Sequence, residues 1–242
     1  SHMNSEKEMK KILDGLIEGA GMRGAILTTK EGFSRMSVGK VEESAAPIVA
    51  SLSSMSSQVL HGFARKELDY VLTKSKATVV ISVPVGMRMN LAVFVDRDAV
   101  ELEGIETLVS RVKAASIQLA AIEEVTSYEE GSILYMVKKE IPEAFMVAVL
   151  TIEGMPLDVY PSLDYVTSAG MLSAVSMVCD KLAKEDESEY SVIVGDDSII
   201  ILYKLPQSRV LAVGVSKERK VGEYLLKVKK IVDNVEKLLT DK

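Results

Sequence analysis

The chain has 242 residues, of which 48% are hydrophobic and 26% are charged, and its formal net charge is −6. This is the balance of an ordinary globular protein, long enough for one large domain or two of about 120 residues. A negative chain is a poor match for nucleic acid, because phosphate binding needs a concentrated basic surface. No apolar run approaches the ~20 residues that span a bilayer. A single cysteine, Cys179, excludes internal disulfides and indicates a reducing, cytoplasmic compartment.

The first elements along the chain are a helix and a hairpin. Residues 5–20 have the apolar spacing of one helical face. Residues 24–39 then predict two β-strands joined by a Glu31-Gly32 turn. Gly32 lies where a tight turn requires a positive φ, which glycine adopts at little cost.

A second helix is predicted over residues 44–65, with Ser44 as its N-cap and most other positions occupied by alanine or serine. Its apolar ridge consists of Ile48, Leu52, Met55, Val59 and Phe63. Three short strands follow, at Leu68–Thr73, Ala77–Val85 and Asn90–Val95. The short loops between them favour antiparallel pairing. A single helix bearing Leu102, Ile105, Leu108 and Ile122 closes this half.

The second half of the chain repeats this order. Glu153-Gly154 repeats Glu31-Gly32 122 residues later, close to half the chain length, which indicates an internal duplication. The matching elements are helix 128–141, hairpin 145–160, helix Leu163–Ala183, strands Tyr190–Val194, Ser198–Leu205 and Arg209–Val215, and a last helix over 221–239. We therefore predict an α+β protein with domains at 5–124 and 125–242, each a five-stranded antiparallel sheet with helices on both faces.

The order α-β-β-α-β-β-β-α, the opening run Gly-Ala-Ile-Leu-Thr-Thr-Lys-Glu-Gly and the small-residue helix at 44–65 resemble the Roadblock family of dynein light chains. That family includes prokaryotic relatives that regulate small Ras-like GTPases. The resemblance covers residues 5–125 and, more weakly, 128–240. The second copy has Phe145-Met146 where the family often keeps a glycine before the first strand.

The resemblance implies a dimer in which two such domains join their sheets edge to edge and lay their central helices side by side. Because both copies lie on one chain, it implies a covalent pseudo-dimer linked by residues 123–130, with further homo-oligomers left open. It also implies a small Ras-like GTPase as the partner.

The residues that could carry catalysis are few. His61 lies on a predicted helix, and Cys179 lies in an apolar helical stretch with no histidine nearby in sequence. No His/Cys cluster has the spacing of metal ligands. The glycines between Gly15 and Gly24 follow a helix, whereas a phosphate-binding loop opens one. We predict no catalytic residue, no metal and no cofactor.

The sequence favours a non-enzymatic interaction or scaffold module. Its expected contact residues are the small or flexible ones of the two central helices: Ser53, Ser54, Ser57, Gly170, Ser173, Ala174 and Met177. The same small residues could instead pack each helix onto its own sheet. The alternatives are a pair of small-molecule-sensing domains, with Tyr70, Tyr190 and Tyr203 as possible lining, or a structural assembly subunit.

Overall fold

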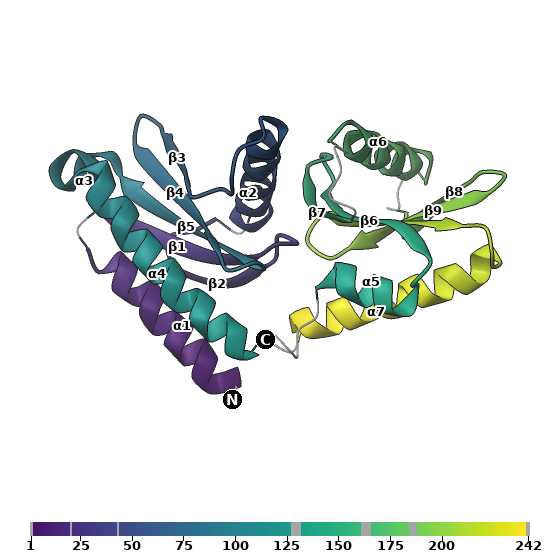
Figure 1. The fold of residues 1–242 in the computed structure, drawn as a ribbon, viewed down its shortest axis with the longest axis horizontal. Helices are drawn as coiled ribbons and strands as arrows, with labels where there is room; N and C mark the ends of the chain where they lie inside the picture. The colour runs from purple at the N-terminus through teal and green to yellow at the C-terminus, as the bar shows by residue number, and fades with distance from the viewer. Residues whose placement is uncertain are drawn as a thin grey trace. The chain divides into compact units, whose positions relative to one another are not determined.

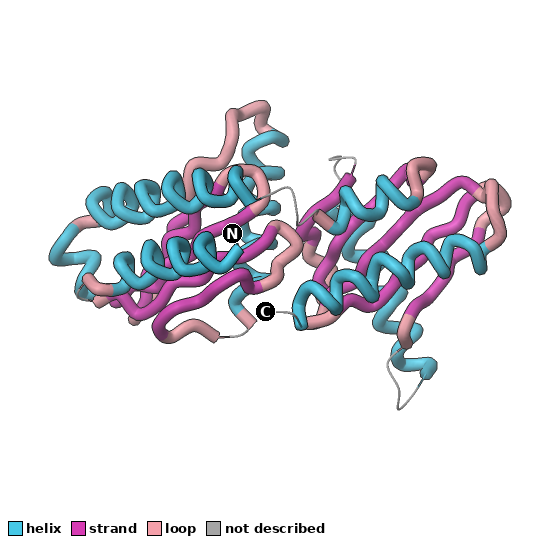
Figure 2. The backbone as a smooth tube through the Cα atoms, turned by 90° about the horizontal axis from the view of Figure 1, so that it is seen from below, coloured by secondary structure: helices cyan, strands magenta, loops and turns pink. Residues whose placement is uncertain are grey.

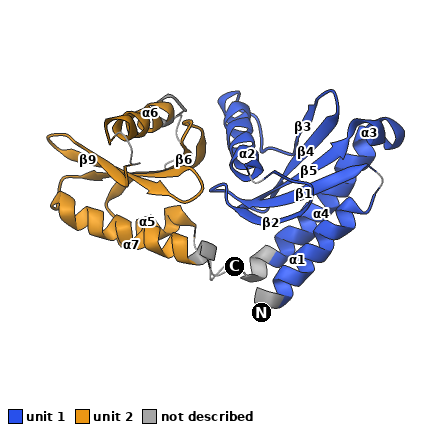
Figure 3. Cartoon of the chain, turned by 180° about the vertical axis from the view of Figure 1, so that it is seen from behind, with its two compact units in different colours: residues 1–130 blue, residues 131–242 orange. Residues whose placement is uncertain are grey.

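The computed structural model describes residues 2–19, 21–42, 44–126, 132–160, 166–183 and 188–240. The chain divides into two compact units, residues 1–130 and residues 131–242 (Figure 3). Each unit is described by itself.

Unit 1 is built on one antiparallel sheet with the strand order β2-β1-β5-β4-β3 (Figure 1). Its elements are α1 (His2–Ile17), β1 (Met22–Thr29), β2 (Ser34–Gly39), α2 (Ala45–Gly62), β3 (Val71–Lys74), β4 (Thr78–Val85), β5 (Met89–Asp96), α3 (Arg97–Glu103) and α4 (Ile105–Thr126). The connections within β3-β4-β5 are tight turns, so these strands pair in sequence order, while β1 pairs with the distant β5.

Successive strand residues point to opposite faces of this sheet, and each face has its own helical layer. Leu27 of β1 and Leu91 of β5 pack in the larger core, beneath α1 and α4. Their sequence neighbours Ile26 and Ala92 face the other way and pack under α2. Figure 2 shows the paired helices α1 and α4 lying along their sheet.

The single closing helix predicted for the first half is wrong, because the structure contains two helices, α3 and α4. Gly104 separates them with φ +86°, and its N–H donates to the Val100 carbonyl at the end of α3. The left-handed φ ends the helix, a conformation that glycine adopts readily. Leu102, expected on the apolar stripe, is consequently exposed.

Unit 2 repeats this architecture with the strand order β7-β6-β10-β9-β8. Its elements are α5 (Ile133–Glu140), β6 (Ala144–Thr151), β7 (Pro156–Tyr160), α6 (Val166–Ala183), β8 (Tyr190–Val194), β9 (Ser198–Leu205), β10 (Arg209–Ser216) and α7 (Val221–Thr240). Ser132 caps α5 by accepting a hydrogen bond from the Tyr135 N–H at 3.1 Å. Residues 128–131 and 163–165 of the predicted helices lie outside the described residues.

The two opening hairpins are closed by the same set of hydrogen bonds. The Thr29 N–H donates to the Phe33 carbonyl at 2.9 Å, and the Thr151 N–H donates to the Met155 carbonyl at the same distance. In both hairpins the threonine hydroxyl also accepts a bond from the residue four positions on, at 3.1 Å and 3.0 Å. Gly32 and Gly154 have φ of +82° and +94°. The predicted repeat of the Glu-Gly turn is confirmed.

Candidate interaction site on the middle helices

The side of α2 that faces its sheet is made of small residues. Ala46, Val49, Ala50 and Ser53 recur at helical spacing and are buried. Ala46 and Val49 pack on Ile26 and Ala92 of the sheet. Small side chains let the helix approach the sheet closely, so its larger apolar residues are not needed for the core.

The outer side of α2 carries those larger residues. Ile48 is 56% exposed, Val59 60% and Phe63 77%, and Met55, on the same side, is also exposed. We call these four residues the α2 stripe. These residues belong to the apolar ridge predicted from the sequence, and they point to solvent. Periodicity predicts that a helix has an apolar stripe without saying which way the stripe faces, and here alanine and serine occupy the core side.

The α6 helix of unit 2 is arranged in the same way. Ser173 and Ser176 are buried, and the Ser173 hydroxyl donates to the Thr151 carbonyl of β6 at 2.9 Å. Gly170 lies against the hairpin turn, because a β-carbon on Gly154 would lie 2.9 Å from the Gly170 Cα. The inner face of α6 thus combines small polar residues with Leu172 and Val175, which pack on the sheet, and it is tied to the end of the hairpin.

The outer face of α6 carries Met171, Val178 and Leu182, which are 66%, 55% and 78% exposed. We call these three residues the α6 stripe. Their spacing of seven and four residues is the spacing of Ile48, Met55 and Val59 in the α2 stripe. The outward apolar face is therefore duplicated together with the fold.

These two helices carry little charge. The 18 residues of α2 include no Asp, Glu, Lys or Arg, and α6 has only Asp180 and Lys181, near its end. An exposed helix face is normally the polar face, so a face that is both apolar and uncharged is a candidate interaction surface.

The seven predicted contact residues fall into three groups by exposure. Ser53 and Ser173 are buried against their own sheets, as the alternative interpretation of small residues expected. Ala174 and Met177 are exposed on α6, while Ser54, Ser57 and Gly170 are partly buried. Sequence reasoning missed the two stripes as surfaces, although it named every residue of the α2 stripe.

One polar cluster anchors the end of α6. The Lys204 ammonium of β9 contacts the Asp180 carboxylate at 2.5 Å, and the Ser188 N–H donates to that carboxylate at 2.8 Å. Burial opposes ionisation of Asp180, but the hydrogen bonds from Lys204 and Ser188 outweigh it and lower its pKa. This cluster ties α6 to its sheet near the α6 stripe.

Unit 1 has a groove of about 1490 Å³ between the first half of α2 and the sheet. Its walls include Ile48, Leu52, Val80 and Phe94.

The tyrosines that were predicted to line a ligand cavity lie elsewhere. Tyr70 is exposed, and Tyr190 stacks on Tyr203 in unit 2 with ring centroids 5.6 Å apart. Burial and the bond that the Tyr203 hydroxyl donates to Glu189 raise the pKa of Tyr203.

The described residues include no group of three or more His, Cys, Asp or Glu side chains arranged to hold a metal ion. His61 is exposed at the end of α2, and Cys179 is half-buried on α6. Within the same residues, no helix is both long enough and apolar enough to cross a membrane.

No family model and no curated protein matches the chain. Several solved structures are similar to it. The gliding protein MglB from Thermus thermophilus is 16% identical, over 50% of this chain and 92% of its own, with a TM-score of 0.44. Myxococcus xanthus MglB is 20% identical, over 49% and 96%, with a TM-score of 0.45. A Roadblock/LC7 domain from Streptomyces avermitilis is 15% identical, over 44% and 96%, with a TM-score of 0.39.

In unit 2 the described elements follow the order α-β-β-α-β-β-β-α, and unit 1 differs only in its divided closing helix. Both units thus have the element order and sheet topology that the Roadblock resemblance implies. The α2 and α6 stripes are the outward faces of the middle helices of the two units.

Proposed function

We propose that the protein is a non-enzymatic interaction module that binds a small Ras-like GTPase through the α2 and α6 stripes. The observation that carries this proposal is the inverted packing of α2 and α6. Each helix buries alanine or serine against its sheet and exposes residues as large as methionine, leucine and phenylalanine.

An arrangement of this kind is costly for a chain with no partner. Each large apolar side chain left in water forgoes about 1.5–3 kcal/mol of burial free energy. The exposed apolar residues recur at the same spacing in both units, which argues that their exposure serves a function. The choice of a small Ras-like GTPase as the partner comes from the Roadblock resemblance of residues 5–125 and 128–240. We propose that the chain binds this partner, and we assign no catalytic residue to it.

The test is retention of purified small Ras-like GTPases from the source genome, loaded with GDP or with a non-hydrolysable GTP analogue. Val59→Lys and Val178→Lys place a charge in the two stripes. Their controls are Ile117→Lys on α4 and Leu226→Lys on α7, which are somewhat more exposed and lie on the other helical layer. We expect the stripe variants to lose retention at unchanged thermal stability and the controls to keep it.

Equal retention by all four variants would refute the proposal, as would a failure of every GTPase to bind the unaltered protein. Loss of binding in the two controls alone would place the partner on the outer helices instead.

The groove of unit 1 favours a second candidate function, small-molecule sensing. It combines apolar walls with charged residues at one end, which is the composition of a ligand site.

A further inference from the structure

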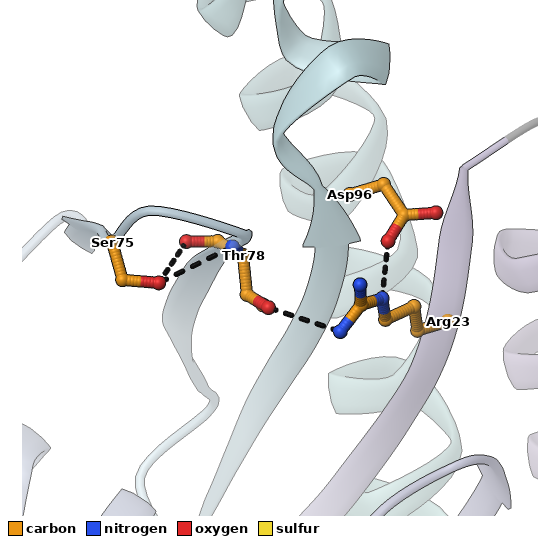
Figure 4. A network of polar contacts seen from close by, with 4 residues as sticks. All are labelled: Arg23, Ser75, Thr78 and Asp96. Carbon is orange, nitrogen blue, oxygen red and sulfur yellow. Dashed lines mark hydrogen bonds and ion pairs between the residues drawn. The ribbon is translucent and has the colours of Figure 1, made fainter.

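The charged end of the unit 1 groove is a network of side chains from three neighbouring strands (Figure 4). The Arg23 guanidinium donates through Nε to the Asp96 carboxylate and through Nη1 to the Thr78 hydroxyl, the latter at 3.1 Å. Ser75 fixes Thr78 by donating its hydroxyl to the Thr78 carbonyl at 2.9 Å and by accepting from the Thr78 N–H at 3.2 Å. Arg23, Thr78 and Asp96 line the groove.

The fold itself does not require this network. In unit 1, Thr78 is the cross-strand partner of Asp96, and in unit 2 the partners at the same end of the sheet are Ser198 and Ser216. Both units have an irregularity where the first strand begins, at Arg23 in unit 1 and at Phe145 in unit 2. Unit 2 therefore forms the same sheet with a phenylalanine and two serines.

Part of the network is free to bind a ligand. Toward the residues that the structure describes, Arg23 uses two of its three guanidinium nitrogens and Asp96 uses one of its two carboxylate oxygens (Figure 4). Both side chains are partly exposed, so solutes reach them. The exposed ion pair between them contributes only about 0.2–1 kcal/mol, which makes it easy to open.

The positive and negative charges at this end of the groove are equal in number. Arg23 and Asp96 are opposite in sign, and the nearby Lys40 and Glu42, which also line the groove, are opposite as well. A ligand with a net charge gains little from such a set. A ligand that carries one cation and one anion side by side complements it, provided that its remaining surface is apolar to match Ile48, Val80 and Phe94.

We propose that the groove of unit 1 binds an α-amino acid with an apolar side chain. The ligand carboxylate accepts from the unused Arg23 nitrogen, the ligand ammonium donates to Asp96, and the side chain packs on Val80 and Phe94. The groove is larger than the ~300–1,000 Å³ usual for a small-molecule site, so the ligand occupies only its charged end. This proposal does not rest on the GTPase proposal, although Ile48 belongs both to the groove wall and to the α2 stripe.

Isothermal titration calorimetry of the full chain with L-leucine, L-methionine and L-phenylalanine tests the proposal. We expect saturable 1:1 binding of at least one of them below about 10 mM. With L-leucine as the ligand, leucinamide lacks the carboxylate and 4-methylpentanoate lacks the ammonium, so each should bind at least about tenfold more weakly. If L-methionine or L-phenylalanine is the amino acid that binds, its amide and its deaminated acid are the control ligands.

Arg23→Gln and Asp96→Asn should each weaken binding about tenfold, while Ser198→Ala and Ser216→Ala, at the matching place in unit 2, should leave it unchanged. Thermal melts check that the variants fold, and the ligand panel on the unaltered chain decides the question if they do not. Absence of saturable binding by all three amino acids would overturn the proposal. So would equal binding of 4-methylpentanoate, or full binding by both folded unit 1 variants.

Discussion

The ring of Phe145 on β6 lies over the backbone of Gly214 on β10, so that a β-carbon at position 214 would lie 2.8 Å from two of its ring atoms. In unit 1 the glycine is on the first strand instead, because Gly24 of β1 is the cross-strand partner of Phe94 of β5, whereas Gly214 of β10 pairs with Met146 of β6. The second copy has no glycine at the start of its first strand, β6, but it has Gly214 on the neighbouring strand, β10.

This relationship predicts a coupling between the two positions. Gly214→Ala should lower the free energy of unfolding by about 1 kcal/mol, because the new methyl group displaces the Phe145 ring. In a Phe145→Ala background the same change should raise it by about 0.5 kcal/mol, since alanine is favoured over glycine in a strand once the space is free. Chemical denaturation of the four proteins measures the coupling, and purely additive effects would contradict it.

The contact between the hairpin turn and α6 gives a second prediction. Gly154→Ala should destabilise unit 2 by about 1–3 kcal/mol, because Gly154 has a positive φ and a β-carbon there would press on the Gly170 backbone. Gly222→Ala in α7 is the control. It has open space around it and should stabilise the helix by up to about 1 kcal/mol. Thermal melts of both variants decide whether the turn and α6 are in contact.

The orientation of α2 can be tested by paired substitutions. Ala46→Leu should cost about 1–3 kcal/mol, because it forces a larger side chain between helix and sheet. Ile48→Ala, two residues away, should change stability by less than about 0.5 kcal/mol, because Ile48 faces solvent. If urea denaturation ranks the two variants in the opposite order, the stripe lies inward.

The anchor of α6 should respond to pH. The folded protein holds the pKa of Asp180 below its ordinary value of 3.8, so the carboxylate stabilises the folded state at pH values above about 4. That stabilisation is lost as the pH falls through the lower pKa of the folded state. Asp180→Asn should therefore cost about 1–2 kcal/mol at pH 7 and progressively less below pH 4.

Thermal melts across this range measure the Asp180→Asn effect. Glu101→Gln, which removes an exposed pair with Arg97, should change stability by less than about 0.5 kcal/mol at any pH. An Asp180→Asn effect that is independent of pH would mean that the cluster acts without its charge.

Much of the fold was predictable because its signals are local. The Glu-Gly turns predicted both hairpins, and the strands β8, β9 and β10 begin at the predicted residues and end within one residue of the prediction. The break at Gly104 was not predictable from spacing, because Leu102, Ile105 and Leu108 keep a helical period across it. Only the left-handed φ of that glycine separates α3 from α4.

The candidate site was only partly predictable, for a different physical reason. Sequence identified α2 as a helix of small residues with an apolar ridge, but whether Ile48 or Ala46 faces the sheet depends on how closely the two layers approach. The network of Arg23, Thr78 and Asp96 was also missed. Its members lie up to 73 residues apart, and no motif joins them.

The lack of charge on α2 has a consequence for how quickly and under which conditions any partner binds there. With no Asp, Glu, Lys or Arg along the helix, α2 itself adds no electrostatic guidance to encounters, so association through the α2 stripe should run near an unassisted rate of about 10⁵–10⁶ M⁻¹s⁻¹. Its affinity should hardly change between low and physiological salt, strengthen in sulfate, and weaken on cooling.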